Sequence, residues 1–144
     1  MNDKDDVILG ELLYGPAFML PGSQLNEEQL LRATTDTYPG RTFCIVKRWM
    51  LIDVRFTGRH LALLSEEELQ PTVLYANVVT YSSAGVRKGP YGVLSSFQRY
   101  FQDCFFETED MVYVLAGRGA RKEADMDAVF ALATKCGAEF LRNP

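Results

Sequence analysis

The sequence predicts a single α+β domain spanning residues 1–144, in which an antiparallel meander of about five or six strands packs with N-terminal and C-terminal helices. Two observations predict this class. The 144 residues are 47% hydrophobic and 24% charged, which is the balance of an ordinary globular domain. Helical periodicity at both ends of the chain flanks a central region in which apolar residues recur at strand spacing.

Two helices are predicted before the strands. Residues 5–15 place apolar side chains at helical offsets and end at a Gly-Pro pair. In residues 25–40, Asn26 is a good N-cap and Gln29 stands at the capping-box position, before a Tyr-Pro-Gly terminus. Residues 16–23 between the two helices are interpreted as an irregular connector.

The middle of the chain changes to strand periodicity. Residues 65–71 interrupt it as a short helical turn with Ser65 as cap, and residues 82–92 form a loop. The last two strands are expected to form a hairpin about Glu109 and Asp110. Strands are predicted at residues 41–49, 50–56, 72–81, 93–101, 104–108 and 111–116.

The segment GRGARK, residues 117–122, is interpreted as the turn that ends the last strand and starts a C-terminal helix closed by Gly137. An alternative is an anion site, in which Arg118, Arg121 and Lys122 attract a phosphate beside backbone N–H groups. Neither the P-loop pattern nor GxGxxG is present, and acidic residues follow the segment directly. The solvated turn is the simpler interpretation.

The sequence lacks the residues that several kinds of catalytic and metal-binding site require. His60 is the one histidine of the sequence. It is therefore the single candidate for the general base of a Ser-His-Asp or Cys-His catalytic site. Cys44, Cys104 and Cys136 are widely spaced and form no CxxC pair, so no zinc spacing exists. We therefore expect no metal and no cofactor, and a binding protein rather than an enzyme.

Charge is unevenly distributed along the chain. The net charge of −4 argues against a general nucleic-acid binder, which would be basic. Residues 1–40 carry seven acids and two bases, whereas residues 41–65 carry five bases and one acid. No apolar run is long enough to span a bilayer, and the acidic start lacks the features of a signal peptide. These features predict a cytoplasmic protein that has no membrane association; they do not predict its oligomeric state.

Aromatic and basic residues meet in two predicted loops. Arg48 and Trp49 lie where one predicted strand ends and the next begins, and Arg87, Lys88 and Tyr91 lie in the 82–92 loop. Arginine beside aromatic side chains is the usual anchor of a protein interface. The pattern predicts a partner-binding surface, and burial of Trp49 in the core is the alternative.

One enzyme pattern is faintly present. Glu107 and Glu109 form a Glu-x-Glu motif before a strand, and the Tyr-Ser-Ser segment 81–83 lies upstream. The arrangement resembles motifs of ADP-ribosyltransferases, which implies that Arg41 or Arg48 would hold NAD. Two exposed glutamates at a hairpin turn are the commoner explanation.

Four segments resemble an uncharacterised family of small proteins from bacterial genomes and prophages. The segments are LLYGP, YPGRTFCIVKRWMLIDV, PTVLYANVVTYSSAG and CFFETEDMVYVLAGRGARK. The resemblance implies a cytoplasmic α+β domain and an accessory role in a mobile element, with a host or phage protein as partner. Our leading hypothesis is a non-catalytic protein-binding protein that acts on a host or defence factor. The alternative is a nucleotide-binding sensor or an ADP-ribosyltransferase-like enzyme.

Overall fold

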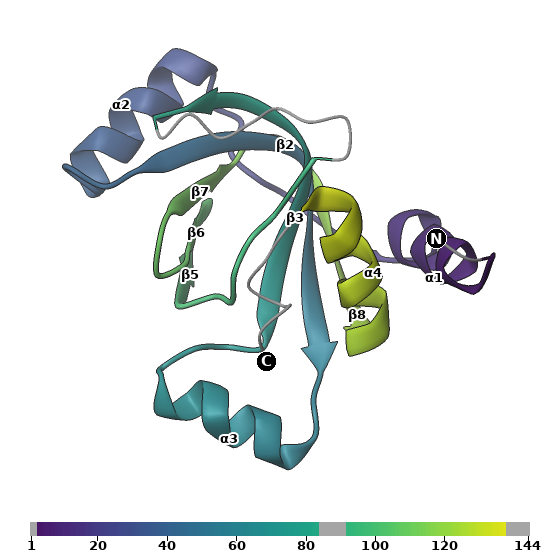
Figure 1. Ribbon diagram of the computed structural model, residues 1–144. Coiled ribbons are helices and arrows are strands. Elements are labelled where there is room, and N and C mark those ends of the chain that lie inside the picture. Colours follow the sequence, from purple (N-terminus) through teal and green to yellow (C-terminus); the bar gives the residue numbers. More distant parts are fainter. Residues whose placement is uncertain (1–2, 84–91, 138–144) are drawn as a thin grey trace.

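A computed structural model describes residues 3–83 and 92–137 of the chain. These residues form four helices and eight strands, and all the strands belong to one curled mixed sheet (Figure 1). The helices are α1 (Asp3–Tyr14), α2 (Glu27–Thr37), α3 (Gly58–Glu66) and α4 (Met126–Cys136). The strands are β1 (Phe18–Leu20), β2 (Phe43–Arg55), β3 (Thr72–Ser82), β4 (Val93–Leu94), β5 (Tyr100–Gln102), β6 (Phe105–Glu107), β7 (Val112–Leu115) and β8 (Gly119–Asp125).

Strand β2 organises the sheet. On one side it pairs antiparallel with β3. On the other side it pairs in parallel with two strands in succession, first β7 and then β8. The sheet order is β1-β8-β2-β7-β6-β5, with β3 and β4 attached through β2. The α+β class is therefore confirmed, but an antiparallel meander describes only part of the sheet, because β7 and β8 run in the same direction as β2.

Local signals predicted several elements correctly. The Asn26 side chain accepts from Gln29 N at 2.9 Å, and the Gln29 side chain accepts from Asn26 N at 3.0 Å, which completes the capping box of α2. Strands β6 and β7 form the expected hairpin. Helix α4 ends at Gly137, whose φ of 68° is the left-handed conformation that favours glycine.

Several predictions about elements were wrong. The strand predicted at residues 93–101 is two short strands, β4 and β5, with residues 95–99 outside both. Residues 119–125 form strand β8, and α4 begins directly after it, so GRGARK is not a turn into a helix. The connector 16–23 contains β1, which pairs with β8. The helix predicted at residues 65–71 is α3, which begins seven residues earlier at Gly58 and leaves Ser65 in its last turn.

Side chains of β2 change face at Arg48. Val46 and Trp49 lie in the same core cluster although they are three residues apart, and in β3 Ala76 and Val79 do the same. Regular alternation would place residues three apart on opposite faces of a sheet. Arg48 has a positive φ of 53°, a conformation uncommon outside glycine, which resets the alternation. The two strands predicted at 41–49 and 50–56 are therefore one strand with an irregularity.

The sheet has an inner face, toward the β5–β6 hairpin, and an outer face covered by helices (Figure 1). The outer core packs β2 against α1 and α4, through residues that include Met50, Ile52, Val54, Leu12, Val129 and Leu132. A smaller outer cluster lies beneath α2, around Leu30, Phe43, Ile45 and Val114. The inner core contains Val46, Trp49, Leu51, Leu74, Phe106 and Leu115. Among the described residues, none of the helices is both long and apolar enough to cross a membrane.

Candidate functional site

An ion pair between Asp53 and Arg121 lies at the centre of the candidate site. Arg121, in β8, donates from Nε to Asp53 Oδ2 and from Nη2 to Asp53 Oδ1, both at 2.8 Å. Thr72, in β3, donates its hydroxyl to Oδ1 at 2.7 Å. The strands on both sides of β2 therefore hold the same carboxylate, and the two parallel bonds from the guanidinium fix its orientation.

Both partners of this pair are partly open to solvent, with 32% of the Asp53 side chain and 35% of the Arg121 side chain exposed. Partial burial acts to raise the pKa of Asp53, but the hydrogen bonds from Arg121 and Thr72 and the charge of Arg121 outweigh it. The pKa of Asp53 is therefore below its ordinary value. The carboxylate stays ionised at neutral pH and is an acceptor, not a general acid.

A second, more exposed ion-pair group continues toward the end of β2. Arg55 donates to Glu123 Oε2 at 3.4 Å and to Asp125 Oδ1 at 3.0 Å. Each of these side chains is more than half exposed, so the pairs add little to stability. Asp53 is the register partner of Glu123, and Arg55 that of Asp125, so all four side chains share one face of the sheet.

A hollow of about 660 Å³ lies over this charged surface. It is lined by Asp53, Arg55, Arg121, Lys122 and Glu123 together with Phe18 and the Pro16–Ala17 segment. Residue Phe18 is 81% exposed, which is unusual for a large apolar residue in a strand. An aromatic ring thus stands beside arginine guanidinium groups at an open hollow. We call this set the β1–β8 surface: Phe18, Asp53, Arg55, Arg121 and Glu123.

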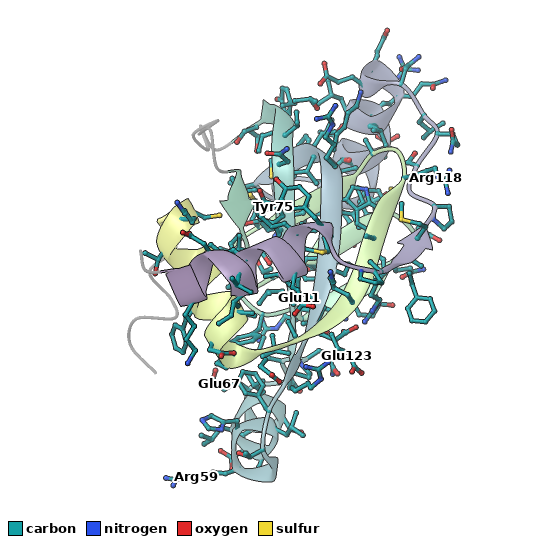
Figure 2. The ribbon with its side chains drawn as sticks, turned by 90° about the vertical axis from the view of Figure 1, so that its right-hand side faces the viewer. Glu11, Arg59, Glu67, Tyr75, Arg118 and Glu123 are labelled. Carbon is teal, nitrogen blue, oxygen red and sulfur yellow. The ribbon has the colours of Figure 1, made fainter. Side chains whose placement is uncertain are left out.

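Lys122 follows Arg121 along β8, so its side chain points to the other face of the sheet and has a different role. Its Nζ donates to the backbone carbonyls of Glu11 and Leu12 at 2.9 and 2.8 Å. These are carbonyls of the last turn of α1, which has no basic residue of its own there. Figure 2 shows α1, with Glu11, next to β8. Lys122 therefore joins α1 to the sheet.

Two of the three cations of the anion site predicted at GRGARK are engaged in contacts within the chain. Arg121 is bound to Asp53, and Lys122 is bound to the end of α1. Arg118 is exposed and lies at the opposite end of β8 from Glu123 (Figure 2). The glycines do not precede a helix, so no helix N-terminus adds its dipole at this segment.

The two glycines of this segment, Gly117 and Gly119, both contact the Trp49 side chain. Gly117 has a φ of 70°, and its carbonyl accepts from Trp49 Nε1 at 3.2 Å. A Cβ at Gly119 would lie 2.1 Å from a carbon of the Trp49 ring, a distance that side chains do not tolerate. Glycine at 119 therefore allows the backbone to approach the indole. Trp49 is only 2% exposed and belongs to the core.

Of the predicted aromatic and basic patch, two residues, Arg48 and Trp49, lie in the part of the chain that the structure describes. Trp49 is buried, which removes its ring from contact with a partner. Arg48 is exposed at the irregularity of β2. Arg87, Lys88 and Tyr91 lie outside the described residues.

The residues of the ADP-ribosyltransferase-like pattern meet at one end of the sheet, where they make structural contacts. Arg41 Nη1 lies 2.7 Å from Glu107 Oε1, and Arg41 also donates to the Thr108 carbonyl at 3.4 Å. The Ser83 hydroxyl accepts from Phe43 N at 2.9 Å and donates to the Phe43 carbonyl at 3.1 Å. Glu109 is exposed in the turn between β6 and β7. Arg41 is thus the charge partner of Glu107.

The histidine and the cysteines are held in ordinary surroundings. His60 stacks on Phe56 with ring centroids 5.3 Å apart, and its Nδ1 lies 3.1 Å from the Thr57 hydroxyl. Among the described residues, none of the three cysteines forms a disulfide. Burial raises the pKa of Cys44 to about 12 and that of Cys136 to about 11, which suppresses the reactive thiolate. The described residues contain no cluster of three or more potential metal ligands.

Sequence analysis did not identify Phe18, Asp53 or Arg55 as site residues. Asp53 and Arg55 were visible as the polar positions of an alternating strand, but their partners lie about 70 residues away in β8. Phe18 lay in a segment interpreted as a connector. A Pro-x-apolar-apolar-apolar-Pro pattern is the signal that could have indicated a short edge strand at residues 16–21.

Comparison with protein families matches residues 21–131 to the domain of unknown function DUF6957. The chain belongs to this family. The match includes β2, β3 and β8 and therefore Asp53, Thr72 and Arg121, but it begins after Phe18. No curated protein and no solved structure matches the chain. Membership of an uncharacterised domain family, expected from the resemblance of the four segments, is confirmed.

Proposed function

We propose that this DUF6957 chain is a non-catalytic protein-binding module and that the β1–β8 surface is its docking site. The observation that carries the proposal is the exposure of Phe18 at the edge of a hollow lined by Arg55 and Arg121. Protein interfaces are enriched in aromatic residues and arginine, and a few such residues supply most of the binding energy.

The ion pairs of this surface support docking rather than chemistry. The Asp53 carboxylate accepts three hydrogen bonds, so it is not poised to take or give a proton near neutral pH. Arg121 uses Nε and Nη2 for Asp53 and is held rigidly by them. A rigid guanidinium loses little conformational entropy when a partner carboxylate or carbonyl reaches its remaining N–H groups.

The alternative function, nucleotide binding or NAD-dependent ADP-ribosyl transfer, has less support. Its cations at Arg121 and Lys122 and its glutamate at Glu107 are already engaged in contacts within the chain. A nucleotide phosphate at the remaining N–H groups of Arg121 would lie beside the carboxylates of Asp53 and Glu123, whose negative charge repels a phosphate more strongly than a peptide carbonyl or a single carboxylate.

We propose further that the chain is an accessory protein of a mobile element and that its partner is a host or defence factor. This proposal rests on the resemblance of the four sequence segments. Its direct test is the set of genes that neighbour the coding sequence. A prophage or defence locus would support it, and a housekeeping operon would contradict it.

Site-specific photo-crosslinking tests the docking site. A photoreactive amino acid replaces Phe18 in one variant and Leu63 in a control variant, in cells that naturally make the protein. Leu63 is also an exposed apolar residue, 54% accessible, but it lies on α3. We expect one discrete partner adduct from position 18 and not from position 63, and its loss when Arg121 is changed to Ala. Equal adducts from both positions would contradict the proposal.

A further inference from the structure

The N-terminal arm of the chain, residues 3–20, meets strand β8 at two places. Helix α1 leads through residues 15–17 into β1, and β1 pairs with β8. Helix α1 itself lies beside β8, where Lys122 Nζ donates to two carbonyls of its last turn at 2.9 and 2.8 Å (Figure 2). The same strand therefore holds both parts of the arm.

Strand β1 buries little of its own surface. Phe18 is 81% exposed and Met19 is 57% exposed, and a strand of three residues forms few ladder hydrogen bonds. On its C-terminal side the chain is held at Ser23, whose N–H donates to the Leu115 carbonyl at 3.0 Å. On its N-terminal side the next helix or strand is α1. The position of Phe18 therefore depends on how the chain is anchored at Ser23 and at α1.

The link between α1 and β1 is too short to absorb a large displacement of the helix. Its three residues, 15–17, span at most about 10 Å. Gly15 N donates to the Glu11 carbonyl at 2.9 Å, and a Cβ at Gly15 would overlap that oxygen and lie 3.4 Å from Lys122 Nζ. The link thus starts directly at the contact between α1 and Lys122. Movement of α1 away from β8 is therefore transmitted to β1.

Helix α1 depends strongly on this contact. Among its described side chains Leu9 and Leu12 are buried in the outer core, whereas Val7 is 69% exposed and Tyr14 is 86% exposed. A helix of 12 residues is marginal on its own in water. The Lys122 ammonium adds charged hydrogen bonds at the negative end of the helix dipole, and such bonds are stronger than neutral ones. Loss of this contact should therefore favour local opening of α1.

We propose that Lys122 is the positioning residue of the β1–β8 surface and that opening of the N-terminal arm is the switch that disables docking. While Lys122 holds α1, β1 stays paired with β8 and Phe18 stays at the hollow. When the contact breaks, α1 and β1 leave β8 together. Arg121 and Asp53 then remain on β8 and β2 without the aromatic ring. The consequence for partner binding rests on the proposed function, whereas the coupled opening of the arm does not.

Amide hydrogen exchange of the purified chain, followed residue by residue by NMR, tests the coupled opening. Lys122→Met keeps an apolar stem and removes the ammonium, and Lys47→Met, at an exposed lysine of β2, is the control. We expect Lys122→Met to speed exchange at least about tenfold in α1 and at the β1–β8 pairing, with α2 unchanged. Unchanged exchange, acceleration in only one part of the arm, equal acceleration in α2, or the same acceleration in Lys47→Met overturns the proposal.

A lengthened link separates this coupling from direct contact of Lys122 with a partner, which is needed because Lys122 also lines the hollow. A flexible Gly-Ser segment of about six residues is inserted between Pro16 and Ala17. In this lengthened chain, Lys122→Met should speed exchange in α1 alone, and β1 should stay protected. If β1 still opens with α1, the link does not couple them and the proposal is overturned.

The partner adduct formed from a photoreactive residue at position 18 tests the consequence for docking. We expect Lys122→Met to lower its yield at least about tenfold in the chain with the natural link and to leave it unchanged in the lengthened chain. A yield that falls equally in both chains means that Lys122 contacts the partner directly, which overturns its positioning role. If the wild type forms no adduct at all, the docking proposal fails, and the exchange measurements still decide whether the arm opens as one unit.

Discussion

The Trp49 indole lies directly against the Cα of Gly119, and its Nε1 donates to the carbonyl of Gly117 at 3.2 Å. This contact joins β2 to the start of β8 at the point where β7 ends. It is inside the core, since Trp49 is 2% exposed. The glycines that first suggested an anion-binding loop are thus required by a buried ring.

Gly119→Ala should destabilise the protein by about 1–3 kcal/mol or more, because the added methyl group overlaps the indole. Chemical denaturation measures the loss. Gly10→Ala is the matched control, since a Cβ at Gly10 meets nothing within 4 Å and alanine favours the helix. A Gly119→Ala protein as stable as the Gly10→Ala protein would show that the close approach is not present in solution.

Trp49→Ala should cost about 3–5 kcal/mol of stability, as truncation of a buried aromatic side chain does. Arg48→Ala should stay within about 0.5 kcal/mol, because Arg48 is exposed. Both values come from thermal or chemical unfolding. If Trp49→Ala left stability unchanged but abolished partner binding, the result would support the binding surface predicted at Arg48, Trp49, Arg87, Lys88 and Tyr91.

Arg121→Ala should lower stability at pH 7 by about 1–2 kcal/mol, since the pair is about one third exposed and solvent screens part of it. The pKa of Asp53 is lowered on folding, so its contribution is complete above its unfolded value near pH 4 and disappears as pH falls through the folded value. The gap between wild type and Arg121→Ala should therefore narrow below about pH 4.

The control for this pH dependence is Arg55→Ala, which removes the exposed pairs with Glu123 and Asp125. Its effect should be close to zero at every pH, because these pairs are solvated. A gap for Arg121→Ala that is independent of pH between 2 and 7 (roughly the range over which carboxylates titrate) would mean that Asp53 is not its partner.

A nucleotide panel that includes NAD and cyclic dinucleotides should leave the melting temperature unchanged, because Arg121 and Lys122 are engaged within the chain. Binding at a hundred times the dissociation constant would stabilise by about 2.7 kcal/mol, which thermal shift detects readily. A clear shift that disappears in Arg118→Ala would instead support the nucleotide-sensor function.

The sequence by itself determined the elements whose signals are local. The capping box of Asn26 and Gln29, the hairpin of β6 and β7, and the glycine terminus of α4 depend on residues within a few positions of each other. Such contacts form by the same rules in any context. For that reason the α+β class and these three features could be predicted.

Only the tertiary structure decided β8, β1 and the docking surface. The segment Gly119–Asp125 is polar and has little intrinsic strand preference, but it becomes a strand because β2 and β1 satisfy its backbone on either side. The partner of Asp53 lies 68 residues away in sequence, at Arg121. Parallel pairing between strands that are far apart in the sequence leaves no local pattern of residues. Strand β8 and its pairing with β2 therefore become evident only in the tertiary structure, where the long strand β2 is in place.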